Sequence, residues 1–139
     1  MHPTYIEKRG QFMSISIAKI DHVVLNVTDT DRAIAFYRDV LGCEVERTVE
    51  RIGLVQMRAG ASLIDLFPAK APSETPNMDH FCLRVEPWNV DEIMAHLEKH
   101  GVEKGKTVTR YGAEGDGPSI YIRDPDGNTV ELKGPPVGR

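Results

Sequence analysis

The sequence is short of the residues that several large classes of protein need. It has two cysteines, Cys43 and Cys82, which form neither a Cys-x-x-Cys pair nor a disulfide framework. No apolar run approaches the roughly 20 residues that cross a bilayer, and no apolar segment of a secretory signal follows the start. We therefore expect a protein of the reducing cytoplasm that has no membrane partner.

Aromatic residues and positive charge are also scarce. Only 6% of the residues are aromatic, which leaves little material for a stacking surface around a ligand. The formal net charge is -4, whereas nucleic-acid binding needs a basic face that replaces counterions. With 139 residues, the chain is long enough for one domain with a core and too short for two ordinary ones. The partner that remains is a small molecule.

The chain does contain an internal repeat. The segment Ile20–Val27 (IDHVVLNV) reappears as Met78–Val85 (MDHFCLRV), and Ser62–Leu66 (SLIDL) reappears as Asn128–Leu132 (NTVEL). Each half therefore opens with a segment that carries one histidine and closes with a segment that carries one carboxylate. Repetition of this kind predicts two structural modules built on one plan.

Hydrophobic periodicity predicts the same order of elements in both modules. We expect strands at 18–27, 43–49, 53–58 and 62–67 around a helix at 30–41, then strands at 79–85, 106–111, 118–123 and 129–133 around a helix at 89–100. This order predicts an α+β fold of two paired βαβββ modules, with one helix on one face of each sheet.

The predicted modules span residues 17–68 and 77–133 and together form one domain, 17–133. Residues 1–16 and 134–139 are predicted to be tails, and the proline-rich stretch 68–77 a linker. The glycine-rich run Tyr111–Gly117 does not open a helix, so it is not a phosphate-binding loop. It is predicted to be either a mobile lid or a loose connection.

Strand alternation separates the side chains that face the helices from those that face a common cavity. On the opening strands the apolar positions pack under the helices, which turns the histidines to the other face. The cavity side is predicted to carry His22, Asn26, Gln56, Asp65, His80, Arg84, Tyr121 and Glu131. We expect Asn26, Gln56 and Tyr121 to line the substrate cavity, and Arg84 either to bind an anionic substrate group or to pair with a carboxylate.

Two imidazoles and two carboxylates on one face indicate a metal site. A lone histidine in an apolar strand is usually a core residue, but His22 and His80 occupy equivalent positions of the repeat. Glu131, between two apolar residues, would be a costly buried charge without a bound partner. Donors of this kind with no thiolate suit Ni²⁺, Co²⁺, Zn²⁺, Mn²⁺ or Fe²⁺. Asp65 is the least certain ligand, because its side chain is one methylene shorter than that of Glu131.

Three segments resemble the vicinal oxygen chelate superfamily, which includes glyoxalase I, extradiol dioxygenases, fosfomycin-resistance enzymes, methylmalonyl-CoA epimerase and bleomycin-binding proteins. They are Ile20–His22, Ala35–Gly42 (AFYRDVLG) and Arg123–Glu131 (RDPDGNTVE). The resemblance covers residues 17–133. It implies paired modules around a metal-lined cleft, a homodimer, and the metal ligands His22, Asp65, His80 and Glu131.

The ligand set is most similar to that of glyoxalase I. This resemblance implies a lyase or isomerase that acts on a small oxygenated substrate through a metal-bound enediolate, with Glu131 as the base and Asp65 as the second carboxylate. Asn26 stands where glyoxalase I has an arginine for the glutathione carboxylate. Ala69, rather than an asparagine, follows four residues after Asp65. Glutathione is therefore not expected as the cosubstrate.

Two other functions stay open. An extradiol-type iron dioxygenase would use only His22, His80 and Glu131, which leaves more coordination positions for a catechol and dioxygen. A non-catalytic protein that sequesters a drug, as in bleomycin resistance, would hold its ligand in the cleft without a metal. The low aromatic content and the complete ligand set count against this second alternative.

Overall fold

The computed structural model describes residues 7–8, 11–12, 19–69 and 78–137. The first module contains β3 (His22–Val27), α1 (Thr30–Ala35), the π-helical turn η1 (Phe36–Val40), β4 (Glu44–Val49), β5 (Leu54–Ala59) and β6 (Ser62–Pro68). The second contains β7 (Phe81–Arg84), α2 (Val90–Lys99), β8 (Val108–Gly112), β9 (Gly115–Arg123) and β10 (Thr129–Lys133). The two βαβββ modules confirm the predicted fold class.

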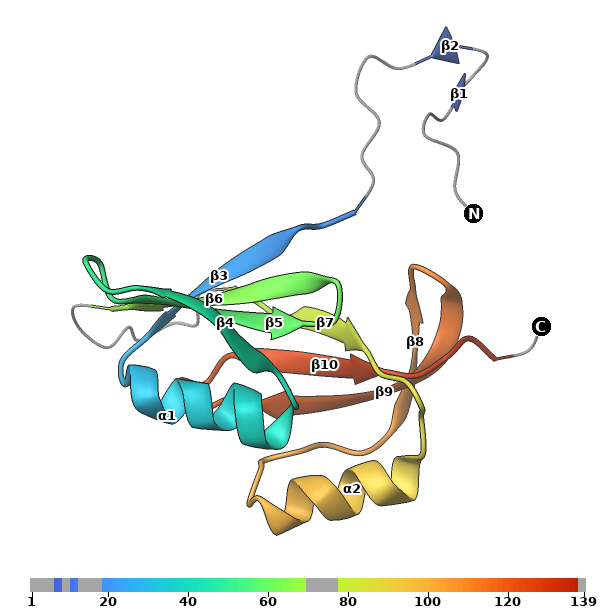
Figure 1. Cartoon of the computed structure of the whole chain (residues 1–139). Helices are drawn as coiled ribbons and strands as arrows, with labels where there is room; N and C mark the ends of the chain where they lie inside the picture. The colour runs from blue at the N-terminus through green and yellow to red at the C-terminus, as the bar shows by residue number, and fades with distance from the viewer. Residues whose placement is uncertain (1–6, 9–10, 13–18, 70–77, 138–139) are drawn as a thin grey trace.

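Each module has one four-stranded mixed sheet. The strand orders are β3-β6-β5-β4 and β7-β10-β9-β8 (Figure 1). In both sheets the closing strand lies between the opening strand, to which it is parallel, and the preceding strand, to which it is antiparallel. The opening strand, which begins at His22 in the first module and directly after His80 in the second, is thus a direct neighbour of the strand that carries the carboxylate. Val24 lies opposite Asp65, and Cys82 lies opposite Glu131.

The helices begin and end where local chemistry favours it. The Asp29 side chain accepts a hydrogen bond from the Arg32 backbone N–H, and the Asn89 side chain accepts one from the Glu92 N–H. Both contacts satisfy amide groups that have no partner within the first turn. Gly42 and Gly101 follow the two helices with φ of 75° and 65°, a backbone conformation that other residues adopt only with strain.

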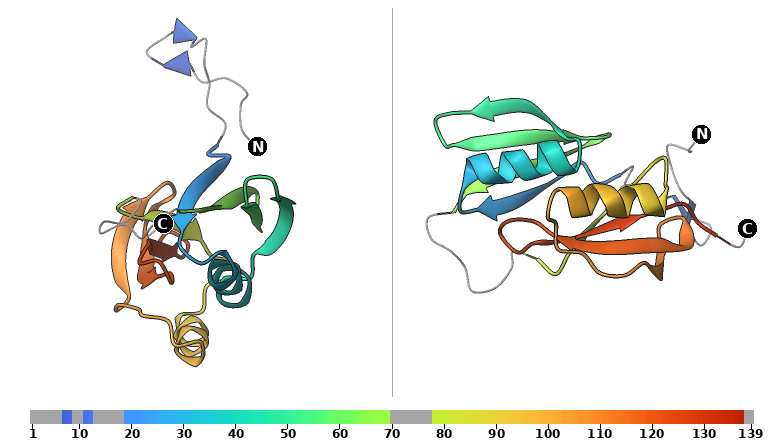
Figure 2. Two further views of the ribbon diagram at one scale, coloured as in Figure 1. Left: turned by 90° about the vertical axis from the view of Figure 1, so that its left-hand side faces the viewer. Right: turned by 90° about the horizontal axis from the view of Figure 1, so that it is seen from below.

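The two modules meet through their helices and share one core. Both helices lie on the same side of the two sheets, and Figure 2 shows them side by side. The Tyr37 hydroxyl of η1 donates a 2.8 Å hydrogen bond to Asp124 in the turn between β9 and β10, and His96 of α2 contacts the Val40 carbonyl at 2.8 Å. Burial, together with the charge of Asp124, raises the pKa of Tyr37, so the phenol remains a donor. This packing fixes one module against the other.

The structure of the glycine-rich run differs from the predicted loose connection. It belongs to an antiparallel hairpin in which Tyr111 pairs with Asp116 and Gly112 with Gly115. Ala113 and Glu114 form the turn between the paired positions. The reason is that β9 starts at Gly115, three residues earlier than Pro118, where strand composition alone places it. The run therefore forms a wall of the second module.

The remaining differences lie at the ends of elements. The opening strands begin at His22 and Phe81, rather than at Ala18 and Asp79. In the predicted N-terminal tail, the short strands β1 (Glu7–Lys8) and β2 (Gln11–Phe12) pair with each other. Most of the predicted linker, 70–77, lies outside the described residues. In the part of the chain that is described, no helix has both the length and the apolar character that crossing a membrane requires.

Candidate metal site

The second module brings His80 and Glu131 into contact. His80 Nε2 lies 3.3 Å from Glu131 Oε1. The other carboxylate oxygen of Glu131 accepts a 2.6 Å hydrogen bond from the Ser119 hydroxyl, and the residue is only 6% exposed. The ring of Tyr121, which lies opposite Glu131 in the sheet, packs edge-on against His80 with centroids 5.7 Å apart. The imidazole and the carboxylate thus bring together one half of the predicted ligand set.

The first module carries the equivalent pair, His22 and Asp65, on its own opening and closing strands. Asp65 is 4% exposed, and both of its carboxylate oxygens accept hydrogen bonds from the Gln56 amide, at 3.2 and 3.1 Å. The pKa of His22 is raised, first by its hydrogen bond to Asp21 and further by the charge of Asp65. Asn26 projects from the exposed face of β3, where alternation places it with His22.

An aspartate orients each histidine, and the sequence prediction assigned neither aspartate a role. His22 Nδ1 lies 2.8 Å from Asp21 Oδ1, and His80 Nδ1 lies 2.7 Å from Asp79 Oδ2. A carboxylate on Nδ1 fixes the tautomer that leaves Nε2 free to bind a metal, and it increases the basicity of the ring. The repeated Asp-His dipeptide was the available signal for this role.

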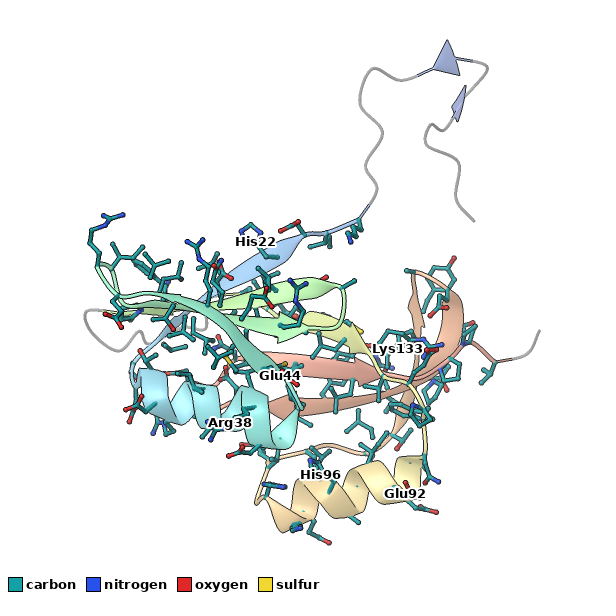
Figure 3. All side chains as sticks on the ribbon, viewed as in Figure 1. His22, Arg38, Glu44, Glu92, His96 and Lys133 are labelled. Atoms are coloured by element: carbon teal, nitrogen blue, oxygen red, sulfur yellow. The ribbon has the colours of Figure 1, made fainter. Side chains whose placement is uncertain are left out.

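A single chain does not bring the two halves together. In the described ranges, no three side chains among histidine, cysteine, aspartate and glutamate form a group that could hold a metal ion. His22 lies on the face of the upper sheet that points away from α1, whereas Lys133 marks the lower sheet of the second module (Figure 3). Among the described residues, the four predicted ligands therefore do not form one group within a single chain.

The second module contains a cavity of about 350 Å³ around its half of the ligand set. Its lining includes His80 and Glu131, and the β8–β9 hairpin forms one wall. Arg84 and Lys133 contribute two positive charges to it. Arg84 pairs with Glu114 of the hairpin at 2.6 Å, and the Lys133 ammonium donates to the backbone carbonyls of Arg110 and Gly117. The sequence prediction assigned no role to Lys133, Glu114 or Ser119.

Burial affects the protonation of both cysteines in the metal-free protein. Cys82 lines the cavity and is exposed, and burial of its sulfur, together with the charge of Glu131, raises its pKa to about 11. Burial likewise raises the pKa of Cys43 to about 11. Both thiols are therefore protonated at neutral pH while no metal is bound, and neither belongs to the predicted ligand set of imidazoles and carboxylates.

The residues that are present fit a divalent metal. Asp65 and Glu131 are buried carboxylates, and within the described residues neither lies at ion-pair distance from a lysine or arginine. A buried carboxylate without a cation is costly, so the site favours a bound positive charge. Two oriented imidazoles complete a donor set that first-row divalent metals accept.

Known proteins are similar to this chain in both sequence and fold. A family model described as the Glyoxalase/Bleomycin resistance protein/Dioxygenase superfamily matches residues 19–132. A virulence protein of Salmonella typhimurium is 34% identical over 133 residues, which cover 90% of this chain and 90% of that protein. Its crystal structure matches with a TM-score of 0.73 and 30% identity, covering 87% of this chain and 99% of that one.

The matches include enzymes of different reaction types. The crystal structure of a lactoylglutathione lyase from Agrobacterium tumefaciens has a TM-score of 0.64 and 30% identity, covering 85% of this chain and 94% of that chain. Other similar proteins are named methylmalonyl-CoA epimerase and manganese-dependent 2,3-dihydroxybiphenyl 1,2-dioxygenase. Lyases, epimerases and dioxygenases thus share this fold, and the reaction has to be inferred from the site.

Proposed function

Because the chain belongs to the glyoxalase/bleomycin resistance/dioxygenase superfamily, we propose that it is a metal-dependent lyase or isomerase of the glyoxalase I type. The observation that carries the proposal is a unit repeated in both modules. Each unit is an aspartate-oriented histidine beside a buried carboxylate that has no lysine or arginine partner. Its substrate is a small oxygenated compound that undergoes proton transfer. Both cysteines are free thiols, and we place the protein in the reducing cytoplasm.

His22, Asp65, His80 and Glu131 would hold the metal, which we expect to be Ni²⁺, Co²⁺, Zn²⁺, Mn²⁺ or Fe²⁺. When bound, such an ion supplies Lewis-acid chemistry, which makes a C–H bond beside a carbonyl more acidic. The order of metal affinities does not choose among these ions, so the metal has to be measured.

The two carboxylates would move the proton. Glu131 is the proposed base, because one of its oxygens is fixed by the Ser119 hydroxyl while the other faces His80. It would take the proton from the carbon beside the substrate oxygen and return it to the neighbouring carbon, so the reaction consumes no oxidant or reductant. Asp65, oriented by Gln56, is the second carboxylate that could receive or return this proton.

The substrate would lie along the cavity face of the sheets. Arg84 is the candidate contact for an anionic group, and Asn26 and Gln56 offer neutral hydrogen-bonding groups from the first module. Tyr121 packs beside His80 and would form part of the wall. Asn26 is neutral where glyoxalase I carries an arginine for glutathione, which is why the proposal does not include glutathione.

We propose that two copies of the chain complete the site, with the first module of each facing the second module of its partner. A single chain separates the two half-sites, and the cavity face of the first module exposes apolar side chains. Val24 is 47% exposed and Phe67 is 36% exposed beside the buried Asp65. A second copy would cover this face and join both pairs of ligands.

The oligomeric state tests this arrangement. We expect sedimentation velocity to show a dimer, and a charge on the exposed sheet face, as in Val24→Asp, to dissociate it and weaken metal binding together. Thr109→Asp, which places a charge on an exposed position of β8, is the control. A wild-type monomer that holds the metal tightly would refute the shared site.

A second candidate function is a metal-dependent dioxygenase. The observation that favours it is the position of Asp65, whose two oxygens are both engaged by the Gln56 amide. If Asp65 stays with Gln56, the remaining ligands are His22, His80 and Glu131, which leaves more positions for a catechol and dioxygen. Oxygen uptake with catechols in the presence of Fe²⁺ or Mn²⁺ would identify this activity.

Metal content is the first test of the proposed function. The untagged protein is saturated with a mixture of divalent ions, freed of loosely bound metal and measured by mass spectrometry. We expect about one metal per chain, and a loss of it in His80→Asn and Glu131→Gln. A fully folded wild-type protein that retains no metal would refute the proposed lyase and favour a binding protein without metal.

The proton-transfer step has its own assay. A panel of small hydroxy ketones and keto acids is incubated with the metal-loaded protein in deuterium oxide, and exchange at carbon is followed by NMR. Proton abstraction by Glu131 predicts exchange that Glu131→Gln abolishes. Asp65→Ala distinguishes the four-ligand site from the three-ligand site. Unchanged metal affinity and unchanged exchange in this variant would exclude Asp65 as a ligand.

A further inference from the structure

The cavity of the second module contains an arginine that the protein itself neutralises. Arg84 ends the cavity face of β7, and its Nε lies 2.6 Å from Glu114 Oε1. Another guanidinium nitrogen of Arg84 donates to the Val85 carbonyl at 2.9 Å. Both side chains line the cavity that also contains His80 and Glu131. The pairing therefore lies at the cavity of the proposed active site.

The hairpin that carries Glu114 is anchored to the floor of this cavity. Lys133 lies opposite Arg84 in the sheet and is only 6% exposed. Its ammonium donates to the carbonyls of Arg110 on β8 and Gly117 on β9, so it ties both strands of the hairpin to β10. Gly112 passes so close that a Cβ there would lie 2.6 Å from the lysine side chain. This close fit holds the Ala113–Glu114 turn beside Arg84.

The Arg84 guanidinium can bind a negative group of a ligand when Glu114 leaves it. Arg84 and Lys133 are both cationic. The Lys133 ammonium donates its hydrogen bonds to backbone carbonyls, and these neutral groups do not cancel its charge. Two carboxylates, Glu114 and Glu131, line the same cavity, and Glu114 is the one that forms an ion pair with Arg84. A guanidinium binds a planar carboxylate or a phosphonate through two parallel hydrogen bonds, a geometry that the single contact with Glu114 does not use.

The Arg84–Glu114 pair is weak enough to exchange. The Glu114 side chain is 53% exposed, and an ion pair open to solvent stabilises a protein by about 0–1 kcal/mol. An anionic group that is also held elsewhere in the cavity competes with Glu114 at little cost. Since Glu114 stands on a turn, it can leave Arg84 without disturbing the strand pairing of β8 and β9.

We propose that Glu114 is an internal carboxylate that occupies Arg84 in the free protein and is displaced by the anionic group of the substrate. The substrate of the proposed lyase is then a small oxygenated acid, which carries a carboxylate or a phosphonate. This inference rests on the proposed function for the reaction and on the cavity alone for the binding step. His80 and Arg84 are four residues apart, about 13 Å along an extended strand. Because both side chains line the same cavity, a single substrate would have to span this gap.

Anion binding by the metal-free, full-length protein tests the inference. Acetate, malonate, methylphosphonate and inorganic phosphate are each titrated while the arginine Nε–H signals are followed by NMR, and Arg84→Lys assigns the signal of Arg84. We expect at least one of these anions to shift that signal. Glu114→Gln should bind the same anion about two- to fivefold more tightly, because loss of an ion pair worth up to about 1 kcal/mol removes a competitor. Arg84→Gln should abolish binding.

Glu46→Gln is the matched control. Glu46 forms a comparable exposed ion pair with Arg58, at 3.2 Å, in the other sheet. We expect this variant to bind each anion as the wild type does. The carboxylate and phosphonate probes distinguish the two substrate chemistries, since the preferred anion should gain most from Glu114→Gln.

Several outcomes would overturn the inference. A Glu114→Gln variant that binds anions no more tightly than the wild type would show that Glu114 is not a competitor. Weaker binding would make Glu114 part of the ligand site, and an unmoved Arg84 signal with every probe would remove Arg84 from anion binding. Because these titrations contain no metal, failure to retain metal would refute the proposed lyase without affecting them.

Discussion

Asp79→Ala should weaken metal binding although Asp79 itself is not a proposed ligand. The Asp79 carboxylate lies 2.7 Å from His80 Nδ1 and therefore selects the tautomer in which Nε2 is unprotonated and points toward Glu131. Without it, the imidazole can rotate and can carry its proton on either nitrogen. Loss of a carboxylate that orients a metal-binding histidine typically lowers metal affinity by about 10- to 100-fold.

The exposure of Asp79 sets the size of this effect. Its side chain is 95% exposed, so water competes for the hydrogen bond and the expected loss lies at the lower limit, about tenfold. Asp79→Asn should lose less than Asp79→Ala, since the amide oxygen can still accept from Nδ1–H. The double variant with Asp21→Ala should lose about the product of the single effects, because each aspartate orients a different histidine.

A competitive titration measures the effect. Zn²⁺ is shared between the protein and a fluorescent chelator at pH 7.5, and the dissociation constants of the variants are compared. Asp91→Asn, which removes an exposed carboxylate from the first turn of α2, is the control, and it should bind Zn²⁺ as the wild type does. If Asp79→Ala binds Zn²⁺ within twofold of the wild type, the orienting role assigned to Asp79 is wrong.

Three other predictions concern buried or titrating groups. Tyr37→Phe removes a buried hydrogen bond to the charged Asp124, and chemical denaturation should show a loss of about 1.5–3 kcal/mol in the free energy of unfolding. Cys82 has a pKa of about 11, so iodoacetamide should label it at pH 7.5 at least about tenfold more slowly than a free cysteine, and the rate should keep rising above pH 9. NMR titration of the metal-free protein should give His22 a pKa above 6.5 that falls in Asp21→Asn. Since the folded pKa is raised, the stabilisation by protonated His22 should be complete below about pH 6.5 and lost as the pH rises through the folded pKa.

The repeat in the sequence predicts most of the half-sites. Alternation places His22 and Asp65 on the face away from α1, and His80 and Glu131 on the equivalent face of the second sheet, because a side chain in a strand can take only one of two directions. The parallel pairing of opening and closing strands then places each carboxylate on the strand next to the segment with the histidine, and in the second module His80 contacts Glu131. The Gln56–Asp65 contact follows from the same alternation, since these residues lie directly opposite each other in adjacent strands.

The relation between the modules could not be predicted in this way. It depends on contacts such as that of Tyr37 with Asp124, which join residues far apart in the chain and leave no periodic signal. The orienting role of Asp21 and Asp79 could not be predicted for a different reason. Strict alternation turns a residue that precedes a strand histidine to the opposite face, whereas both aspartates lie outside the strands and can bend back to the imidazole ring.

Neutral hydrogen-bond donors explain why the histidine–carboxylate pair of one module does not need the pair of the other module to be stable. In each half, the buried carboxylate retains a neutral hydrogen-bond donor, Gln56 for Asp65 and Ser119 for Glu131. These donors give each carboxylate a hydrogen bond without cancelling its charge, so the chain can fold before any metal is bound. The remaining negative charge then favours binding of a metal ion that contacts both carboxylates at once. If two copies form the site, binding of the metal and association of the chains must strengthen each other by the same factor. Gln56→Lys would place a positive charge beside Asp65. This variant should therefore remove the coupling between metal binding and association of the chains, and leave the fold intact.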